Sequence, residues 1–210
     1  MNIDVFHDTV CPWCRIGQVH LRQAIERWGG EPVNVHYRAF LLDPTTPSEG
    51  RPMSDLVAKL GGQARADEMH ARVCSMGEAC GVDFTFEQIQ RIPNTIRSHQ
   101  LLKLAPLARQ EEVVNALHEA HFSRGQDIGD IDVLVDIAGC LGMDQEAVRD
   151  GLVNQTKLTE VLGDLNFARE AGITGVPFFI FDGKYALSGA QPLEVFVQVM
   201  EQISAEKVLE

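Results

Sequence analysis

The chain has 210 residues, of which 45% are hydrophobic and 23% charged, so one or two globular domains with a sizeable core are expected. Its 30 acidic side chains outnumber its 18 basic ones and give a formal net charge of -12. Nucleic acids and anionic membranes both require a cationic surface, so this charge balance argues against either as a partner.

The N-terminal residues show no recognisable targeting signal. Met1 to Asp4 lack the basic segment and apolar stretch of a secretory signal, and no run approaches the roughly 18 apolar residues of a membrane span. We therefore expect a cytoplasmic protein. Because the cytosol keeps thiols reduced, we do not expect the five cysteines to form a structural disulfide framework.

The first 40 residues predict a strand–helix–strand unit. Residues 2–7 and 33–40 alternate as strands do, and residues 12–28 have the broad apolar face of a helix that Gly29-Gly30 ends. Two strands joined by one helix imply a parallel pair with a right-handed crossover.

A turn-rich linker at 43–52 separates this unit from a long helical stretch. From about residue 53 to 172 the pattern predicts helices only, with Asp130 or Asp132 and Asn154 as N-caps. The predicted helices span 54–60, 64–80, 95–109, 111–124, 132–141, 144–152 and 155–171.

Strand character returns at 177–181, followed by Asp182-Gly183, a hairpin signal, and by a partner strand at 185–188. A last amphipathic helix covers 193–203. The order is therefore βαβ, then helices, then ββα. It predicts a discontinuous α/β domain of residues 1–45 and 172–210 and a helical insertion domain of residues 46–171.

The tetrapeptide Cys11-Pro12-Trp13-Cys14 lies where the first predicted strand meets the first helix. The helix N-terminus favours a thiolate on Cys11, and the thiolate is the nucleophile in disulfide exchange. Cys14 lies one turn further in and is expected to be more buried. Cys11 is then the exposed, attacking thiol, and Cys14 resolves the mixed disulfide. Pro12 suits the first helical turn, and Trp13 is expected to shield one side of the pair.

The dithiol and the nearby histidines also allow other roles. A structural zinc ion needs four ligands, and no second Cys or His pair lies at short spacing, so no metal is expected. His7 precedes Cys11 by four residues and would favour the thiolate if it were charged; otherwise it is a strand-end residue without a role. His118 and His121 are expected to be packing or surface residues.

Three further cysteines follow the dithiol. Cys74 and Cys80 are six residues apart on one predicted helix and point in different directions, which favours separate thiols over a secondary redox pair. Cys140 lies in an apolar helix and is expected in the core.

Together, these motifs resemble the DsbA-type branch of the thioredoxin superfamily and, within it, the FrnE-like cytosolic members. The resemblance rests on the dithiol after the first strand, on the helical insertion, and on Gly175-Val176-Pro177-Phe178-Phe179 before the hairpin. It extends over nearly the full length. It also includes Asn94-Thr95 with His99, Phe122 near Gly125, residues 127–134 and Gly189-Ala190-Gln191.

The resemblance implies an α/β thioredoxin fold with a central mixed sheet and a large all-α insertion domain over the active site. It implies that Pro177 is cis and lies against the dithiol, and that the Val176 backbone pairs with an extended substrate segment. Asn94 and His99 match positions that the family keeps near the site, although the sequence alone describes a helix cap and a surface or core histidine. Arg15 departs from the aromatic residue that relatives often have there.

The predicted function is a cytosolic thiol–disulfide oxidoreductase or isomerase acting on thiol- or disulfide-containing proteins or small molecules. It needs no cofactor beyond the dithiol, with a cellular thiol such as glutathione as co-substrate, and either a monomer or a homodimer fits. One alternative is a glutathione-dependent transferase or isomerase similar to kappa-class transferases and 2-hydroxychromene-2-carboxylate isomerases. Those relatives have serine in place of Cys11 and lack the second thiol. The other alternative is a non-enzymatic, chaperone-like peptide binder.

Overall fold

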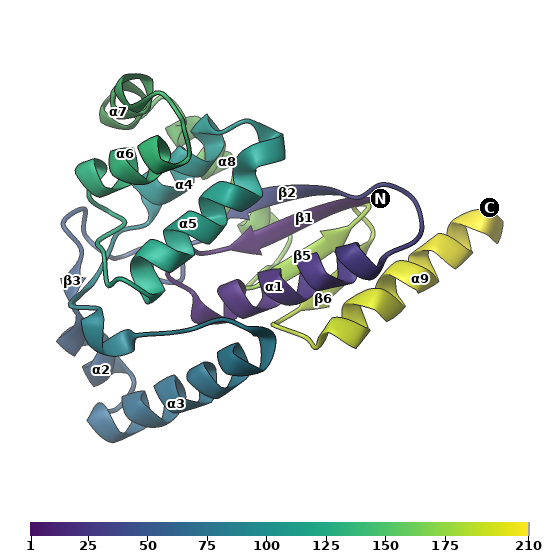
Figure 1. The fold of residues 1–210 in the computed structure, drawn as a ribbon, viewed down its shortest axis with the longest axis horizontal. Coiled ribbons are helices and arrows are strands. Elements are labelled where there is room, and N and C mark those ends of the chain that lie inside the picture. The colour runs from purple at the N-terminus through teal and green to yellow at the C-terminus, as the bar shows by residue number, and fades with distance from the viewer. Residues whose placement is uncertain (210) are drawn as a thin grey trace.

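The computed structural model describes residues 1–209, and the side chains of residues 1–207. In this part of the chain a four-stranded sheet has the order β2-β1-β5-β6 (Figure 1). The strands are β1 (Asn2–His7), β2 (Asn34–Ala39), β5 (Phe178–Phe181) and β6 (Tyr185–Ser188). β1 pairs with β2 in parallel and with β5 antiparallel, so the sheet is mixed, as predicted.

The strands form where apolar side chains alternate. In β1, Ile3 and Val5 are buried and lie opposite Phe181 and Phe179 of β5, so one face of the sheet carries a continuous apolar surface. The predicted Asp182-Gly183 hairpin is confirmed, because both residues have positive φ angles of 49° and 69°.

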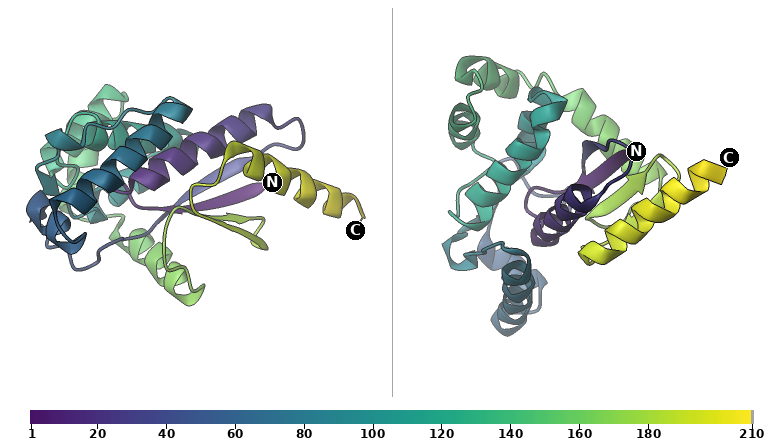
Figure 2. Two further views of the ribbon diagram at one scale, coloured as in Figure 1. Left: turned by 90° about the horizontal axis from the view of Figure 1, so that it is seen from below. Right: turned by 45° about the vertical axis from the view of Figure 1, so that its right-hand side comes forward.

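Helices cover the sheet on both sides (Figure 2). α1 (Pro12–Arg27) and α9 (Leu193–Leu209) pack against each other on one face, and α8 (Leu158–Glu170) contacts β2 from the other. The N-terminal turn of α1 points toward the helices inserted between β2 and β5 (Figure 1). Any chemistry at that turn therefore takes place between the sheet and the inserted helices.

The inserted segment is mostly helical, with four departures from the prediction. Arg51–Pro52 (β3) and Arg91–Ile92 (β4) form a short antiparallel ladder, the second strand lying within the stretch predicted as helices only. The predicted helix 95–109 ends at Leu104 because Pro106 follows. Asp130 is an N-cap, but Asn154 is the C-cap of α7. The helices are α2 (Met53–Lys59), α3 (Gln63–Cys80), α4 (Ile96–Leu104), α5 (Gln110–Phe122), α6 (Ile131–Cys140) and α7 (Gln145–Val153), with 3-10 turns at Phe86–Gln88 and Leu107–Arg109.

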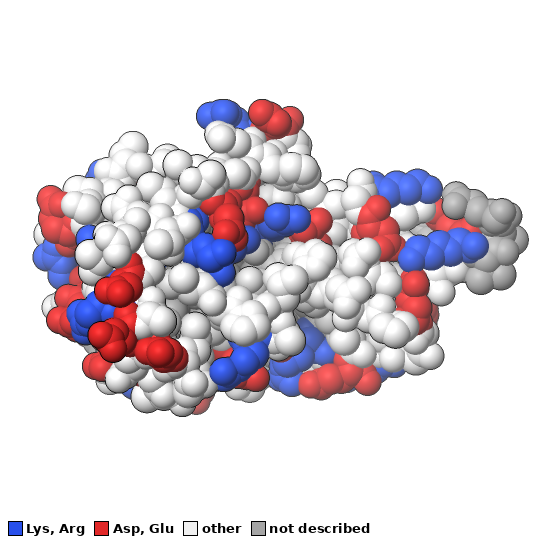
Figure 3. Space-filling model, turned by 90° about the horizontal axis from the view of Figure 1, so that it is seen from above, with Lys and Arg blue, Asp and Glu red and all other residues white. Residues whose placement is uncertain are grey.

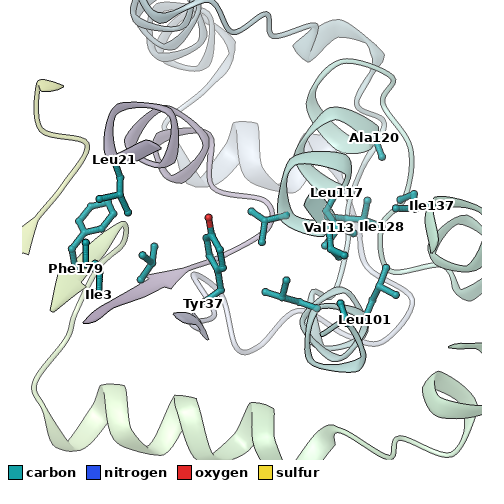
Figure 4. Packing of buried hydrophobic residues seen from close by; sticks show 14 of the residues in the cluster. Ile3, Leu21, Tyr37, Leu101, Val113, Leu117, Ala120, Ile128, Ile137 and Phe179 are labelled. Atoms are coloured by element: carbon teal, nitrogen blue, oxygen red, sulfur yellow. The ribbon is translucent and has the colours of Figure 1, made fainter. Parts of the chain in front are cut away.

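One apolar core runs through the sheet and the inserted helices. Leu21 and Phe179 belong to its sheet side, Leu101 and Leu117 to its helical side, and Tyr37 of β2 lies between them (Figure 4). The core cluster is thus shared by both predicted domains. The boundaries at residues 46 and 171 remain a prediction.

The surface carries both signs of charge. Acidic and basic side chains are interspersed on the face shown in Figure 3. Among the described residues, no helix is long and apolar enough to cross a membrane.

Candidate active site

The loop between β1 and α1 positions the dithiol. The Cys11 backbone N–H donates to the Asp8 carbonyl at 3.0 Å, and Cys11 is then the N-cap residue of α1, with Pro12 at the first helical position. The Cys14 backbone N–H points back at the Cys11 sulfur at 3.3 Å. The Cys11 sulfur thus occupies the place that a capping oxygen takes at other helix starts.

The turn before β5 lies against the same sulfur. The Val176–Pro177 peptide bond is cis, as the resemblance implied, and the Cys11 thiol donates to the Val176 carbonyl at 3.7 Å. Gly17 of α1 permits this close approach, since a Cβ atom there would lie 3.0 Å from Pro177 Cγ and 3.3 Å from Phe179 Cζ. The helix carrying the dithiol therefore lies directly on the cis-proline turn.

Both thiols are buried. Cys11 and Cys14 are each 2% exposed, so the expectation that Cys11 is the exposed thiol of the pair is wrong for this structure. α3 packs against α1. The Arg72 guanidinium lies 5.6 Å from the Trp13 ring centroid, so Trp13 joins the dithiol turn to α3.

Arg15, the departure from the family pattern, secures the chain that follows α3. Its guanidinium donates to the Asp83 carbonyl at 2.8 Å and to the Ser123 hydroxyl at 3.2 Å, and it lies 5.2 Å from the centre of the Phe84 ring. Arg15 therefore joins the start of α1 to the loop after α3 and to the end of α5.

The pKa of the Cys14 thiol lies well above its ordinary value. Burial is the main cause, and the adjacent Cys11 raises it further through a hydrogen bond and through its charge. Asp8 acts in both directions: a hydrogen bond with its backbone lowers the pKa of Cys14, and the charge of its carboxylate raises it by less. Cys14 is consequently a thiol at neutral pH.

A buried polar cluster of His7, Asp8, His99 and His118 lies next to the dithiol loop, each residue being at most 2% exposed. The ring of His7 lies 5.2 Å from that of His99 and 6.3 Å from that of His118, measured between centroids. His99 Nε2 is 3.2 Å from the Phe40 carbonyl and 3.6 Å from Asp8 Oδ1. The Asp8 carboxylate also accepts the Leu42 N–H at 2.8 Å.

His7 and His118 are neutral at neutral pH. Burial lowers the pKa of His7 well below its ordinary value, with His99 and His118 adding to the shift. Burial likewise lowers the pKa of His118 to about 3 and that of His121 to about 4. The structure thus gives no support to a charged His7 assisting the thiolate, and it places His118 and His121 in the interior.

A cavity of about 390 Å³ opens beside the dithiol loop, with Asp8, Val10 and Pro12 in its wall. Asn94 also lines it; the Asn94 side chain donates to the Thr46 carbonyl at 2.7 Å and accepts the Ile96 N–H at 3.0 Å. Asn94 is therefore both a helix-start residue and part of the cavity wall.

The other cysteines lie apart from the dithiol. All five cysteines are free, and burial raises the pKa of Cys74 and that of Cys80. Cys140 is exposed rather than in the core, because α6 buries Leu134, Ile137 and Ala138 on another face. Among the described residues, no group of three or more His, Cys, Asp or Glu side chains is arranged to hold a metal ion.

Sequence reasoning missed three contributors to the site. Asp8 lies three residues before Cys11, and this short separation could have indicated that Asp8 belongs to the site. Gly17 lies inside an amphipathic helix, where glycine lowers helix stability. Its presence there is a signal that close packing leaves no room for a side chain. Arg72 carries no such local signal, since only the packing of α3 on α1 brings it to Trp13.

The βαβ–ββα sheet, the dithiol at a helix N-cap and the cis-proline turn define a thioredoxin-fold protein. The family model of the DSBA-like thioredoxin domain matches residues 2–201, and the chain belongs to this family. Members of the DsbA family are disulfide oxidoreductases or isomerases.

Similar proteins cover nearly the whole chain. The crystal structure of a probable DsbA oxidoreductase, SCO1869 from Streptomyces coelicolor, is 31% identical with a TM-score of 0.90, covering 98% of this chain and 91% of that one. The uncharacterized protein YwbO of Bacillus subtilis is 27% identical over 99% of both chains.

Two more distant structures share the fold. A 2-hydroxychromene-2-carboxylate isomerase is 15% identical with a TM-score of 0.75, covering 99% of this chain and 98% of its own. The cytosolic disulfide reductase DsbM from Pseudomonas aeruginosa with GSH is 15% identical with a TM-score of 0.71, and the match covers 97% of this chain and 100% of that one.

Proposed function

We propose that this protein is a thiol–disulfide oxidoreductase or isomerase in which Cys11 attacks and Cys14 resolves. One observation carries the proposal: the Cys11 sulfur caps α1, 3.3 Å from the Cys14 N–H and 3.7 Å from the Val176 carbonyl beside Pro177. The helix N-terminus and this N–H stabilise a thiolate on Cys11. The attacking sulfur is thus preorganised before any substrate arrives.

In the first step the Cys11 thiolate attacks one sulfur of a substrate disulfide. The substrate S–S bond breaks, a Cys11–substrate disulfide forms, and the other substrate sulfur leaves as a thiolate. We propose that the Val176 backbone, which is adjacent to Cys11, pairs with an extended substrate segment. Pro12 and Trp13 form the rest of the turn that presents Cys11.

In the second step Cys14 loses its proton and attacks Cys11. Before the first step, the charge of Cys11 is one of the causes that raise the pKa of Cys14. Formation of the mixed disulfide removes that charge, so Cys14 ionises more readily once there is a bond for it to break. The Cys11–Cys14 disulfide then forms, and the reduced substrate leaves with two electrons and takes up a proton.

We propose further that the protein works in the cytoplasm and is recycled by a cellular thiol such as glutathione. The cytosolic disulfide reductase DsbM, whose structure contains GSH, shares the fold and supports this proposal by analogy. The dithiol itself transfers the electrons, so no further cofactor is required. A monomer or a homodimer fits equally, and membership of the FrnE-like branch remains a prediction.

A glutathione-dependent isomerase is the second candidate. The fold shared with 2-hydroxychromene-2-carboxylate isomerase and the cavity beside Pro12 favour it. The Cys11/Cys14 pair argues against it, because an isomerase of that kind has no use for a resolving thiol. The same pair also argues against a purely chaperone-like role, because such a role does not require a cysteine sulfur at the N-cap of α1.

The test is equilibration of wild type and Cys11→Ser against glutathione redox buffers, with the Cys11–Cys14 bond followed by mass and by Trp13 fluorescence. We expect one two-electron transition in wild type and none in Cys11→Ser. A wild type without any reversible transition would rule out the redox function. The glutathione-dependent isomerase would then be the favoured function.

A further inference from the structure

The cavity beside the dithiol loop has a definite chemistry. Its volume of about 390 Å³ lies within the roughly 300–1,000 Å³ of small-molecule sites in proteins. Val10 and Pro12, the two neighbours of Cys11 in the chain, both lie in its wall. A ligand in this cavity therefore lies next to the attacking residue.

Part of the cavity wall is nonpolar. Met69 of α3 and Leu56 of α2 line it together with Phe86, Ile89 and Phe122. Ile89 is 4% and Phe122 1% exposed, so these side chains belong to the packed interior and give the wall a fixed shape. Such a wall gains free energy by taking apolar surface out of water.

The arginine and lysine in the wall are already paired. Asp43 lies 3.5 Å from Arg51 and 2.5 Å from Lys59, measured between the charged atoms. Asp8 and Asp55 add two more acidic side chains to the same cavity. A ligand with several carboxylates would compete with these groups, whereas a neutral, nonpolar body would not.

The burial of Cys11 also favours a small substrate. Cys11 is 2% exposed, Arg72 of α3 lies over the Trp13 ring, and Arg15 joins the start of α1 to Asp83 and Phe84 in the loop after α3. The disulfide of a folded protein is too bulky to reach Cys11 in this arrangement. A small molecule in the cavity lies against Val10 and Pro12, the residues on either side of Cys11 in the chain.

From these observations we infer that the cavity selects a low-molecular-weight disulfide with a neutral, nonpolar body, such as an aromatic ring. This inference rests on the proposed thiol–disulfide function and names its substrate class. Cys11 attacks the disulfide sulfur nearer the cavity mouth, that S–S bond breaks, and a thiolate leaves. Cys14 then displaces the second thiolate as it forms the Cys11–Cys14 disulfide, and two glutathione molecules reduce that bond again.

The experiment compares two neutral disulfides that share one leaving group. The first is bis(2-hydroxyethyl) disulfide, and the second is the mixed disulfide of 2-phenylethanethiol and 2-mercaptoethanol. Glutathione is the reductant, and formation of glutathione disulfide is the readout. We expect kcat/KM to be about tenfold higher for the phenylethyl compound, because its ring leaves water for the cavity wall.

Two tryptophan variants on α3 locate the effect. Met69→Trp fills the cavity and should abolish the phenylethyl preference, so that kcat/KM becomes equal for the two disulfides. Glu68→Trp changes the exposed neighbour outside the cavity and should keep the preference. Should Met69→Trp fail to fold, Leu56→Trp on α2 repeats the test with Val57→Trp as its control.

The outcomes separate the two proposals. Equal kcat/KM for both compounds, or a preference that survives Met69→Trp, would overturn the cavity inference and leave the dithiol function standing. Faster reduction of insulin than of either small disulfide would also overturn it, in favour of protein substrates. Turnover that persists in Cys11→Ser would instead overturn the proposed function itself.

Discussion

The chain carries two cysteine pairs near helices, and they differ in every property that matters for redox chemistry. Cys11 caps the start of α1, where the Cys14 N–H reaches its sulfur at 3.3 Å. Cys74 and Cys80 lie six residues apart in the last part of α3, with the Cys74 sulfur facing the Phe84 carbonyl at 3.8 Å. A helix start offers unpaired N–H donors to a thiolate, and a helix end offers carbonyl oxygens that disfavour it. Position on the helix, rather than cysteine content, distinguishes the two pairs.

The largest expected effect comes from removing the resolving thiol. In Cys14→Ala, Cys11 still attacks but the bound substrate is released only by slower attack of external glutathione, so turnover should fall about 10³-fold and a Cys11–substrate adduct should accumulate. Cys74→Ala and Cys80→Ala should stay within about twofold of wild type, as surface substitutions away from the chemistry do. Turnover with glutathione and intact-protein mass measure both. A large loss in Cys80→Ala would show that the second pair takes part.

The buried histidines beside the first pair make that region sensitive to acid. The pKa of His118 is about 3 in the folded protein and about 6.5 in an unfolded chain, so unfolding takes up a proton between these values. Stability is therefore full above about pH 6.5 and is lost as the pH falls toward 3. From pH 7 to 4.5 this one group accounts for about 2 kcal/mol.

His118→Phe should remove that part of the pH dependence. Neither ring nitrogen of His118 has a hydrogen-bond partner among the described residues, so a phenyl ring of similar size leaves no polar group stranded. Urea unfolding at pH 7 and at pH 4.5 measures the difference. Parallel losses of unfolding free energy in the wild type and the variant would contradict the assignment of this acid sensitivity to His118.

Much of the fold follows from local patterns in the sequence, and the closure of the site does not. Alternation in β1 and the Asp182-Gly183 turn act over a few residues, so both were predictable. The contact of α3 with the dithiol turn joins Trp13 and Arg72, which are 59 positions apart in the chain. No spacing rule reports such a contact.

The smaller errors have both long-range and local origins. Cys140 lies in an apolar run, but only packing decides which side of α6 faces inward. The overlong helix prediction at 95–109 was avoidable, since Pro106 lacks the N–H that a continuing helix needs. Asn154 has the chemistry of an N-cap but follows α7 closely enough to end it.

The close approach of α1 to the cis-proline turn predicts a modest loss from a single methyl group. In Gly17→Ala the new Cβ would lie 3.0 Å from Pro177 Cγ and 3.4 Å from Ala190 Cα, so the helix must shift. Overpacking of this kind costs about 1–3 kcal/mol, against about 1 kcal/mol gained from helix propensity, and a net loss of about 1 kcal/mol is expected.

Gly163→Ala on α8 is the matched control, because nothing lies within 4 Å of the new methyl group. It should raise the unfolding free energy by up to about 1 kcal/mol. Chemical denaturation of both variants gives the comparison. Equal stabilisation by the two alanines would mean that α1 has room to move away from Pro177.

The smallest expected effect tests the link between the two cysteine regions. Arg72 of α3 stacks on Trp13, and Arg72→Leu removes a cation–π contact worth about 0.5–1 kcal/mol. If α3 must lift for a reagent to reach Cys11, the open population should rise about two- to fivefold, and the rate of Cys11 alkylation with it. Peptide mapping after iodoacetamide treatment separates Cys11 from the other thiols. Arg65→Leu, on the exposed side of the same helix, is the control and should leave the Cys11 rate unchanged. Equal Cys11 rates in the two variants would mean that the buried thiol is reached without movement of α3, which leaves the cavity beside Pro12 as the route.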